Sequence, residues 1–280
     1  MEIISSCKQI QDRCLEARSQ GKILGLVPTM GFFHEGHLSL MRWARDHCNM
    51  LAVSLFVNPA QFGPGEDYQC YPRNWEKDMK IAREMGVDLL FAPSAGELYP
   101  PDYATWVEVS GLSEKLCGRS RPTHFRGVTT VVCKLFNLLC PHLAVFGQKD
   151  WQQFVIIHRM VLDLHLPVQV VSRPIVREED GLAMSSRNAY LEPEERRVAP
   201  YVYQGLLKVR DEFQAGESDR QKLESLLKRY YRDNLPQGEL EYAQIVDAYT
   251  LEPGDQVYPG SVVAVAMRLG QARLIDNILL

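Results

Sequence analysis

The sequence predicts an α/β protein, with a Rossmann-like doubly wound parallel sheet followed by a smaller C-terminal α+β domain. Short apolar segments alternate with helical segments from residue 23 to residue 171, which is the pattern of βαβ units. The strand segments are apolar throughout, which indicates that helices cover both faces of the sheet. A length of 280 residues suggests about two domains, taking roughly 150 residues for each.

The elements of the first domain follow from apolar runs and from apolar residues at helical spacing. Pro28, Pro59 and Pro93 each follow or end an apolar run, where a strand is expected to stop. We expect strands at 23–28, 50–57, 87–91, 143–146 and 168–171. We expect helices from about residue 37 and at 75–85, 128–139 and 151–162.

The pattern changes after Pro174. Residues 177–187 are charged and aperiodic, which is typical of a loop. Two helical faces follow within 198–213 and 223–230, and strand-like runs occupy 241–246, 261–267 and 273–279. Such a combination is typical of a small α+β domain. We therefore predict domains at 1–176 and 177–280.

Composition and charge exclude several classes of protein. A hydrophobic content of 46% excludes general disorder, and a net charge of −4 gives no support for a nucleic-acid partner. We find no secretory signal and no apolar stretch long enough to span a bilayer, so we expect no membrane partner. The seven cysteines form no Cys-x-x-Cys pair and are interpreted as small buried hydrophobes. We expect a cytoplasmic protein.

The strongest chemical segment, Met30–His37, follows the first expected strand and opens the first expected helix. Ligands bind at this edge of open α/β sheets, and the N–H groups of a helix N-terminus suit phosphate. His34 and His37 could both point at one phosphate chain. A helix cap with two surface histidines is the simpler alternative. Zinc is disfavoured, because metalloproteases place their histidines at i and i+4.

Two further segments also suit phosphate. Gly147–Asp150 follows a buried strand, where Lys149 would meet phosphate oxygens. The alternatives are a solvated charged loop and a helix cap formed by Asp150. Met184–Arg187 combines two hydroxyls with a guanidinium, which suits either a mobile phosphate clamp or a helix N-cap.

Two other segments suit a polar substrate. Asn58–Phe62 places amides at the end of a strand, where they could recognise paired donors and acceptors. Arg121–Gly127 places Arg121 and His124 beside a helix start, where they suit a carboxylate or a phosphate.

Together these five segments, in this order and spacing, resemble the pantoate–β-alanine ligase family (the pantothenate synthetases) over nearly the whole chain. The family belongs to the nucleotidyltransferase superfamily, whose His-x-Gly-His signature is matched by His34–His37. The resemblance implies ATP-dependent condensation of (R)-pantoate with β-alanine through a pantoyl-adenylate. The products would be pantothenate, a precursor of coenzyme A, with AMP and diphosphate. It also implies Mg²⁺ and a homodimer.

The resemblance also implies roles for individual residues. His37 would be the general acid, Gln61 would contact pantoate and β-alanine, and Gln153 would contact pantoate. Arg121 and His124 would lie near the substrates. No residue is assigned to the metal. The residues that would bind ATP are Met30, Gly31, Phe32, Phe33, His34, Glu35, Gly36, His37, Gly147, Gln148, Lys149, Asp150, Val176, Met184, Ser185, Ser186 and Arg187.

Four positions depart from the family. It usually has leucine at Phe33, a larger apolar residue at Ala60, and glutamate at Cys117 and Gln148. These changes remove no assigned chemical group, so we expect them to affect substrate affinity rather than reaction type. Two rival functions stay open, namely a nucleotidyltransferase acting on another small substrate and a nucleotide-binding protein without turnover. An RNA-binding relative would need a basic surface that this composition does not provide.

Overall fold

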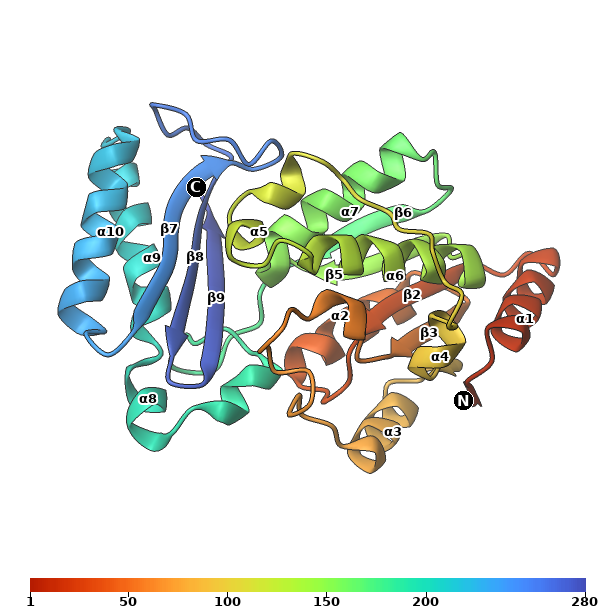
Figure 1. Ribbon diagram of the computed structural model, residues 1–280. Coiled ribbons are helices and arrows are strands. Elements are labelled where there is room, and N and C mark those ends of the chain that lie inside the picture. Colours follow the sequence, from red (N-terminus) through yellow and green to blue (C-terminus); the bar gives the residue numbers. More distant parts are fainter.

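The computed structural model describes all 280 residues and contains two separate sheets (Figure 1). Six parallel strands form the first, in the order β1-β4-β3-β2-β5-β6, and three antiparallel strands form the second, in the order β7-β8-β9. The strands are β1 (Glu2–Ile4), β2 (Leu24–Thr29), β3 (Met50–Leu55), β4 (Leu89–Phe91), β5 (Leu143–Gly147), β6 (Gln169–Arg173), β7 (Glu239–Asp247), β8 (Ser261–Leu269) and β9 (Ala272–Leu279).

Helices cover both faces of the parallel sheet. Leu26 of β2 belongs to the core shared with α1, α6 and α7, whereas its neighbour Val27 belongs to the core shared with α2 and α3. Side chains alternate along a strand, so both faces need apolar residues and the strand is apolar throughout. These helices are α1 (Cys7–Ser19), α2 (Glu35–Asp46), α3 (Trp75–Glu84), α6 (His124–Leu139) and α7 (Trp151–Asp163). Two short helices, α4 (Ala95–Leu98) and α5 (Cys117–Ser120), lie in the connections.

The order of strands reverses between β2 and β5. From β2 the chain continues to β3 and β4 on one side, whereas β5 continues to β6 on the other, although β2 and β5 are hydrogen-bonded neighbours. The connections that leave these two strands therefore diverge, which opens a crevice at their carboxyl ends.

The antiparallel sheet lies between the core of the parallel sheet and a second hydrophobic core. Val262 and Ala264 of β8 join the core of the first sheet, whereas Val263 and Val265 pack in a separate core with α9 (Tyr201–Gln214) and α10 (Arg220–Asn234). In Figure 1 these two helices lie on the outer side of β7, β8 and β9. The sheet is thus buried on both faces, and it closes one side of the crevice.

The predicted α/β fold, a parallel sheet followed by a smaller α+β part, is confirmed, and the strands of that smaller part form an antiparallel sheet. The division at residues 176 and 177 stays a prediction; the last parallel strand ends at Arg173 and the chain then enters irregular structure. No helix of the chain has both the length and the apolar character that a membrane span requires.

Several elements differ from the expectation. Neither β1 nor α1 was predicted from the sequence. A three-residue strand is too short to show a pattern, and the buried face of α1 consists of only three residues, Ile10, Cys14 and Ala17. Helix α6 begins at His124 rather than at residue 128, and the expected helix at 198–213 is divided at Pro200 into α8 (Pro193–Val198) and α9. The seven cysteines are unpaired, but only Cys14 and Cys117 are buried. The interpretation as buried hydrophobes is wrong for Cys70, which is exposed, and holds only in part for the other four, which are half-buried.

Gly127 permits the close approach of α6 to the loop after β3. A Cβ at this position would lie 2.2 Å from the carbonyl oxygen of Ala60 and 2.6 Å from the amide nitrogen of Gln61. Gly127→Ala is therefore expected to destabilise the protein by about 1–3 kcal/mol, with a fall in Tm of roughly 2–4 °C per kcal/mol. Thermal unfolding tests this, with Gly96→Ala as control because its Cβ would meet no atom within 4 Å. Equal Tm values for the two variants would contradict the prediction.

Candidate active site

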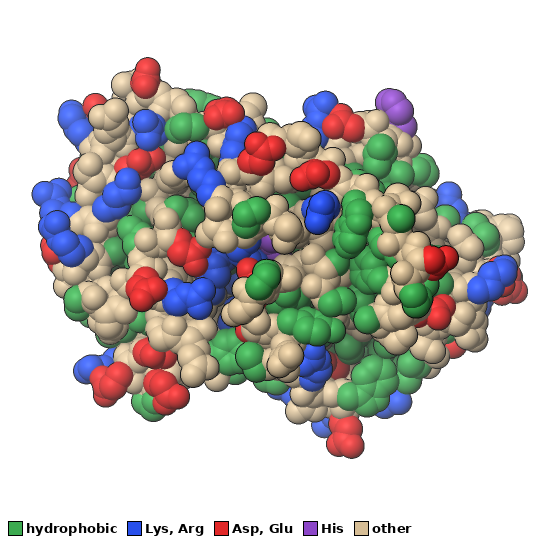
Figure 2. Space-filling model, in the orientation of Figure 1, with side chains coloured by type: hydrophobic (Ala, Val, Ile, Leu, Met, Phe, Trp, Pro, Cys, Tyr) green, Lys and Arg blue, Asp and Glu red, His purple; other side chains and the backbone are tan.

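A cavity of about 270 Å³ lies in the crevice, bounded by the carboxyl ends of β2 and β5 and by the antiparallel sheet. In Figure 2 the molecule is hollowed between its two halves, and Lys and Arg side chains gather around the hollow. The predicted site residues that line the cavity are Met30, His34, Gly36, His37, Gln61, Arg121, His124, Gly147, Lys149, Asp150, Gln153, Val176, Met184, Ser185, Ser186 and Arg187. Those that do not line it are Gly31, Phe32, Phe33, Glu35 and Gln148.

The loop after β2 owes its shape to Asp78 of α3. Gly31 and Phe32 both have positive φ, and the N–H groups of Phe32 and Phe33 each donate to the Asp78 carboxylate at 2.7 Å. Burial raises the pKa of Asp78, and the two N–H donors oppose that rise. This turn sends Phe33 into the core, where it is 2% exposed, while Glu35 pairs with Arg42. These side chains therefore face away from the cavity.

His34 and His37 cap helix α2 and also line the cavity. Nδ1 of His34 accepts from the Gly36 N–H at 3.2 Å, and Nδ1 of His37 accepts from the His34 N–H at 3.4 Å. Because each Nδ1 accepts, the proton of each neutral ring is on Nε2, which remains free to donate. The cap alternative is thus correct, but the histidines are not on the outer surface.

Burial keeps both rings neutral. It lowers the pKa of His34 to about 4, with a further contribution from the charge of Lys149. Burial also lowers the pKa of His37 well below its ordinary value, and His34 and Lys149 act in the same direction. The ring centroids are 4.1 Å apart, so protonation of one disfavours protonation of the other.

Lys149 enters the cavity from the turn after β5. Its ammonium group has no carboxylate partner within ion-pair distance, which leaves it available to an anion. Asp150 is at the N-cap position of α7, but its side chain accepts no capping hydrogen bond, so the capping alternative for this residue is wrong.

The segment Met184–Arg187 lies at the other side of the cavity. Ser185 caps a short 3₁₀ turn by accepting from the Arg187 N–H at 3.2 Å, and Ser186 donates to the Phe32 carbonyl at 3.4 Å. The N-cap interpretation of this segment is therefore correct; the phosphate clamp stays a prediction, for which the segment is placed at the cavity. Arg187 forms a two-point ion pair with Asp67, with both N–O distances at 2.9 Å.

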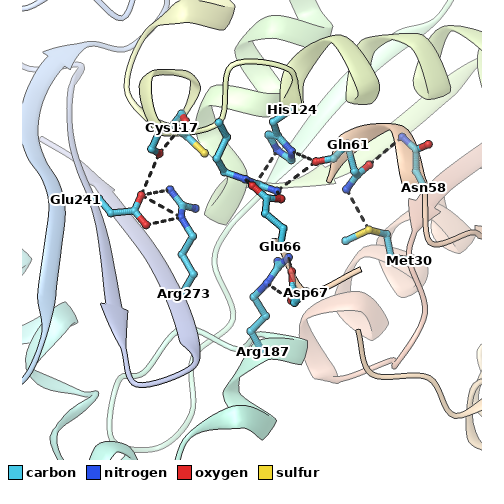
Figure 3. A network of polar contacts seen from close by, with 12 residues as sticks. Met30, Asn58, Gln61, Glu66, Asp67, Cys117, His124, Arg187, Glu241 and Arg273 are labelled. Atoms are coloured by element: carbon cyan, nitrogen blue, oxygen red, sulfur yellow. Dashed lines mark hydrogen bonds and ion pairs between the residues drawn. The ribbon is translucent and has the colours of Figure 1, made fainter. Parts of the chain in front are cut away.

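Gln61 is the centre of a network of polar contacts (Figure 3). Its side-chain amide donates to the Met30 sulfur at 3.1 Å and accepts from Asn58 at 3.2 Å. Its main-chain carbonyl accepts from His124 Nδ1 at 2.8 Å and from Arg121 at 3.3 Å. Arg121 and His124 thus fix the backbone of Gln61.

Arg121 also binds Glu66, with N–O distances of 2.7 and 2.5 Å. Burial opposes ionisation of Glu66 and Asp67, but the adjacent Arg121 and Arg187 outweigh this effect and lower both pKa values. Two neighbouring carboxylates of one loop therefore hold two arginines on different sides of the cavity. Neither carboxylate could be predicted from the sequence, because nothing in that polar loop distinguishes them from solvated side chains.

Asp276 and Asn277 of β9 also line the cavity and were also missed. They lie in a run that the sequence predicts only as a strand. No local pattern could reveal that this strand borders the site. Only the packing of the second sheet against the first brings them there.

The cavity combines neutral imidazole donors, an unpaired lysine and a set of ordered amides. The first two suit a phosphate chain at a helix N-terminus. The amides suit a smaller polar molecule beside it.

Comparisons with known proteins agree with this description. A family model described as pantoate-beta-alanine ligase matches residues 2–279. A pantothenate synthetase from Nitratidesulfovibrio vulgaris (strain DP4) is 55% identical over 280 residues, covering 100% of this chain and 99% of that protein. The crystal structure of pantothenate synthetase from Thermus thermophilus has a TM-score of 0.93 and 44% identity, with 100% and 99% of the two chains covered.

A third relative was solved with small molecules bound. It is pantoate-beta-alanine ligase from Francisella tularensis complexed with beta-gamma ATP and beta-alanine. It has a TM-score of 0.81 and 31% identity, with 100% of this chain and 97% of that chain covered.

The buried histidines predict loss of stability in mild acid. Burial lowers the pKa of His34 to about 4 and that of His124 to about 3, the latter with help from Arg121. Between these values and the unfolded pKa of about 6.5, the unfolded chain binds more protons. The free energy of unfolding should therefore fall as pH decreases below about 6.5, by about 1.4 kcal/mol per pH unit for each such histidine.

Urea unfolding at several pH values tests this expectation. His124→Gln should reduce the slope, because glutamine does not titrate, whereas His47→Gln at an exposed position should leave it unchanged. A variant slope equal to that of the unaltered protein would show that His124 is not buried in its neutral form.

Proposed function

The chain belongs to the pantoate–β-alanine ligase family, and we propose that this cavity is where the enzyme joins pantoate to β-alanine at the expense of ATP. One observation carries the proposal: the turns after β2 and β5, which suit phosphate, line the same cavity as the amide of Gln61. This supports a site in which ATP and the acyl acceptor lie in one cavity, as an adenylating ligase requires.

In the first step, we propose that a pantoate carboxylate oxygen attacks the α-phosphorus of ATP. A P–O bond forms, the bond to the β-phosphate breaks, and diphosphate leaves. Negative charge spreads over the phosphates, and preorganised donors stabilise it best. The Nε2–H groups of His34 and His37, with Lys149 and Arg187, supply such donors.

His37 fits the role of general acid through its environment. Burial keeps its ring neutral, and a bound phosphate chain would raise its pKa, because an adjacent anion favours the charged imidazole. The neutral ring donates its Nε2–H to the phosphate oxygens only as a hydrogen bond. Once a bound phosphate chain has raised its pKa, the ring takes up a proton at Nδ1 at the expense of the hydrogen bond from the His34 N–H, and the imidazolium then transfers its Nε2 proton to the departing phosphate oxygens.

In the second step, the neutral amine of β-alanine attacks the acyl carbon of pantoyl-adenylate. A C–N bond forms, AMP leaves with the shared oxygen, and the nitrogen loses a proton. The adenylate already supplies the activation, so the protein needs to place the amine rather than provide a nucleophile. Gln61 and Gln153 are our candidates for holding pantoate, and Gln61 also for β-alanine.

The loop with Glu66 and Asp67 is suited to exclude water from the adenylate. Its ion pairs with Arg121 and Arg187 tie it to both sides of the cavity. A loop held at two points can close the entrance while product forms.

We propose that Mg²⁺ enters with ATP and is held mainly by phosphate oxygens and water, the mode that this ion prefers. Asp150 lines the cavity next to Lys149 in the chain and could reach such a complex. We also propose a cytoplasmic location, because the reduced, unpaired state of all seven cysteines is typical of that compartment.

A product assay tests the function. Protein with ATP, Mg²⁺ and pantoate should release AMP and form pantothenate in equal amounts only when β-alanine is added. A nucleotidylated product without free AMP would favour the alternative, a nucleotidyltransferase of the same superfamily. Bound nucleotide with no product of either kind would favour a binding protein without turnover.

His37→Ala should slow adenylate formation by about 10²–10³-fold, because one preorganised donor is lost. Single-turnover measurement of diphosphate release isolates this step. His47→Ala serves as the control, since His47 is exposed and stacks on Trp43 outside the cavity. An unchanged single-turnover rate in His37→Ala would refute its role.

The homodimer is also a proposal, and a cluster of aromatic side chains beside α6, formed by Tyr99, Tyr103 and Trp106, supports it. Trp106 is 44% exposed, stacks with Tyr99 and carries the Arg126 guanidinium 5.1 Å from its ring. Large exposed aromatic groups of this kind mark protein interfaces. Sedimentation should give a dimer for the unaltered chain and a monomer for Trp106→Glu. A monomer in both cases would contradict the proposal, as would a dimer that Trp106→Glu leaves intact.

A further inference from the structure

Two adjacent polar residues of β9 are buried at the boundary between the sheets. Asp276 is 3% exposed and Asn277 is 5% exposed. Burial of a carboxylate and an amide is costly unless both are hydrogen-bonded. Their partners should therefore show what this position of the strand is for.

Asn277 reaches from the second sheet to the turn that carries Lys149. Its side-chain nitrogen donates to the carbonyl of Gln148 at 2.9 Å and to the carbonyl of Lys149 at 3.0 Å. Both N–H hydrogens of one amide are thus used on two successive carbonyls of the 3₁₀ turn Gln148–Asp150. Any rotation of this turn would break at least one of these bonds.

Asp276 holds β9 in place next to Asn277. Its carboxylate accepts two hydrogen bonds from Arg177, at 2.6 and 2.9 Å, and a third from the Asn277 main-chain N–H at 2.8 Å. Arg177 in turn donates to the Gly181 carbonyl at 3.1 Å and lies 3.5 Å from the centre of the Tyr203 ring.

Arg177 belongs to the hairpin that leads into Met184–Arg187. It pairs with Ala183 in an isolated bridge, and the Met184 N–H donates to the Val176 carbonyl at 3.0 Å. The same two residues of β9 are therefore connected to two of the three segments that suit phosphate, Gly147–Asp150 directly and Met184–Arg187 through Arg177.

We propose that Asn277 is a positioning residue for ATP, holding the Lys149 turn at a set distance from the segment Met184–Arg187. The proposal rests on the nucleotide site described above. Asn277 acts through the backbone of Lys149. The Asp276–Arg177 ion pair holds this part of β9 at a fixed position relative to Met184–Arg187. Loss of the amide would release the turn and move the Lys149 ammonium relative to the phosphates.

Steady-state kinetics of Asn277→Ala test the proposal. We expect kcat/KM for ATP to fall about 10- to 100-fold, since small displacements of a positioned group have effects of this size. The KM for β-alanine should stay within a factor of about two, because no contact of Asn277 reaches the Gln61 network. The matched control is Asn234→Ala. The Asn234 amide donates to the Tyr230 carbonyl at 2.9 Å within α10, so its loss should leave the KM values for ATP, pantoate and β-alanine unchanged.

A double-mutant cycle separates positioning from general destabilisation. If Asn277 acts through Lys149, then Asn277→Ala should add little to the loss of kcat/KM for ATP in Lys149→Ala. Additive losses would overturn the proposal, as would equal increases in KM for ATP, pantoate and β-alanine. If Asn277→Ala does not fold, the same kinetic measurements and double-mutant cycle are made with Asn277→Ser, whose hydroxyl retains one hydrogen-bond donor in place of the two of the amide.

The cycle also separates this inference from the proposed function. If Lys149→Ala impairs the use of ATP but Asn277→Ala does not, only the positioning role is overturned. If Lys149→Ala itself leaves the ATP kinetics unchanged, the nucleotide site and the inference that rests on it are both overturned.

Discussion

The pairing of β2 with β5 is the constraint on which the rest of the structure depends. These strands are neighbours in the sheet, yet the chain leaves them in opposite directions. Their connections separate, and the N-termini of α2 and α7 face the same crevice. Free N–H groups and the positive ends of helix dipoles meet there, which makes the site suitable for anions before any side chain is considered.

The electrostatics of the cavity are arranged by burial and pairing. The imidazoles of His34 and His37 are kept neutral by burial, so their use of Nδ1 in the helix cap leaves Nε2–H as the outward donor. Arg121 and Arg187 are already neutralised by carboxylates of one loop. Lys149 is the cation in the cavity without such a partner. An incoming phosphate chain therefore meets one unpaired charge and several neutral donors, and it competes with the loop carboxylates for the arginines.

The second sheet closes one side of the cavity and also positions polar groups at it. Its middle strand is apolar on both faces because it packs against the first sheet on one side and against α9 and α10 on the other. Its last strand places polar groups against the Lys149 turn and the hairpin before Met184. The spacing of the segments Gly147–Asp150 and Met184–Arg187 thus depends on a strand that is remote from both in the sequence.

The sequence by itself determined the parallel sheet, the helices and strands of the smaller α+β part, and the segments that border the cavity. These features depend on local patterns: apolar runs, helical spacing, and polar groups at strand ends. It did not reveal that Phe32 and Phe33 face away from the cavity, because their direction follows from a left-handed turn held by Asp78. Nor could it show that Glu66, Asp67 and Asn277 reach the site. Those contacts join residues far apart in the chain, and only the packing of the two sheets and the long loop decided them.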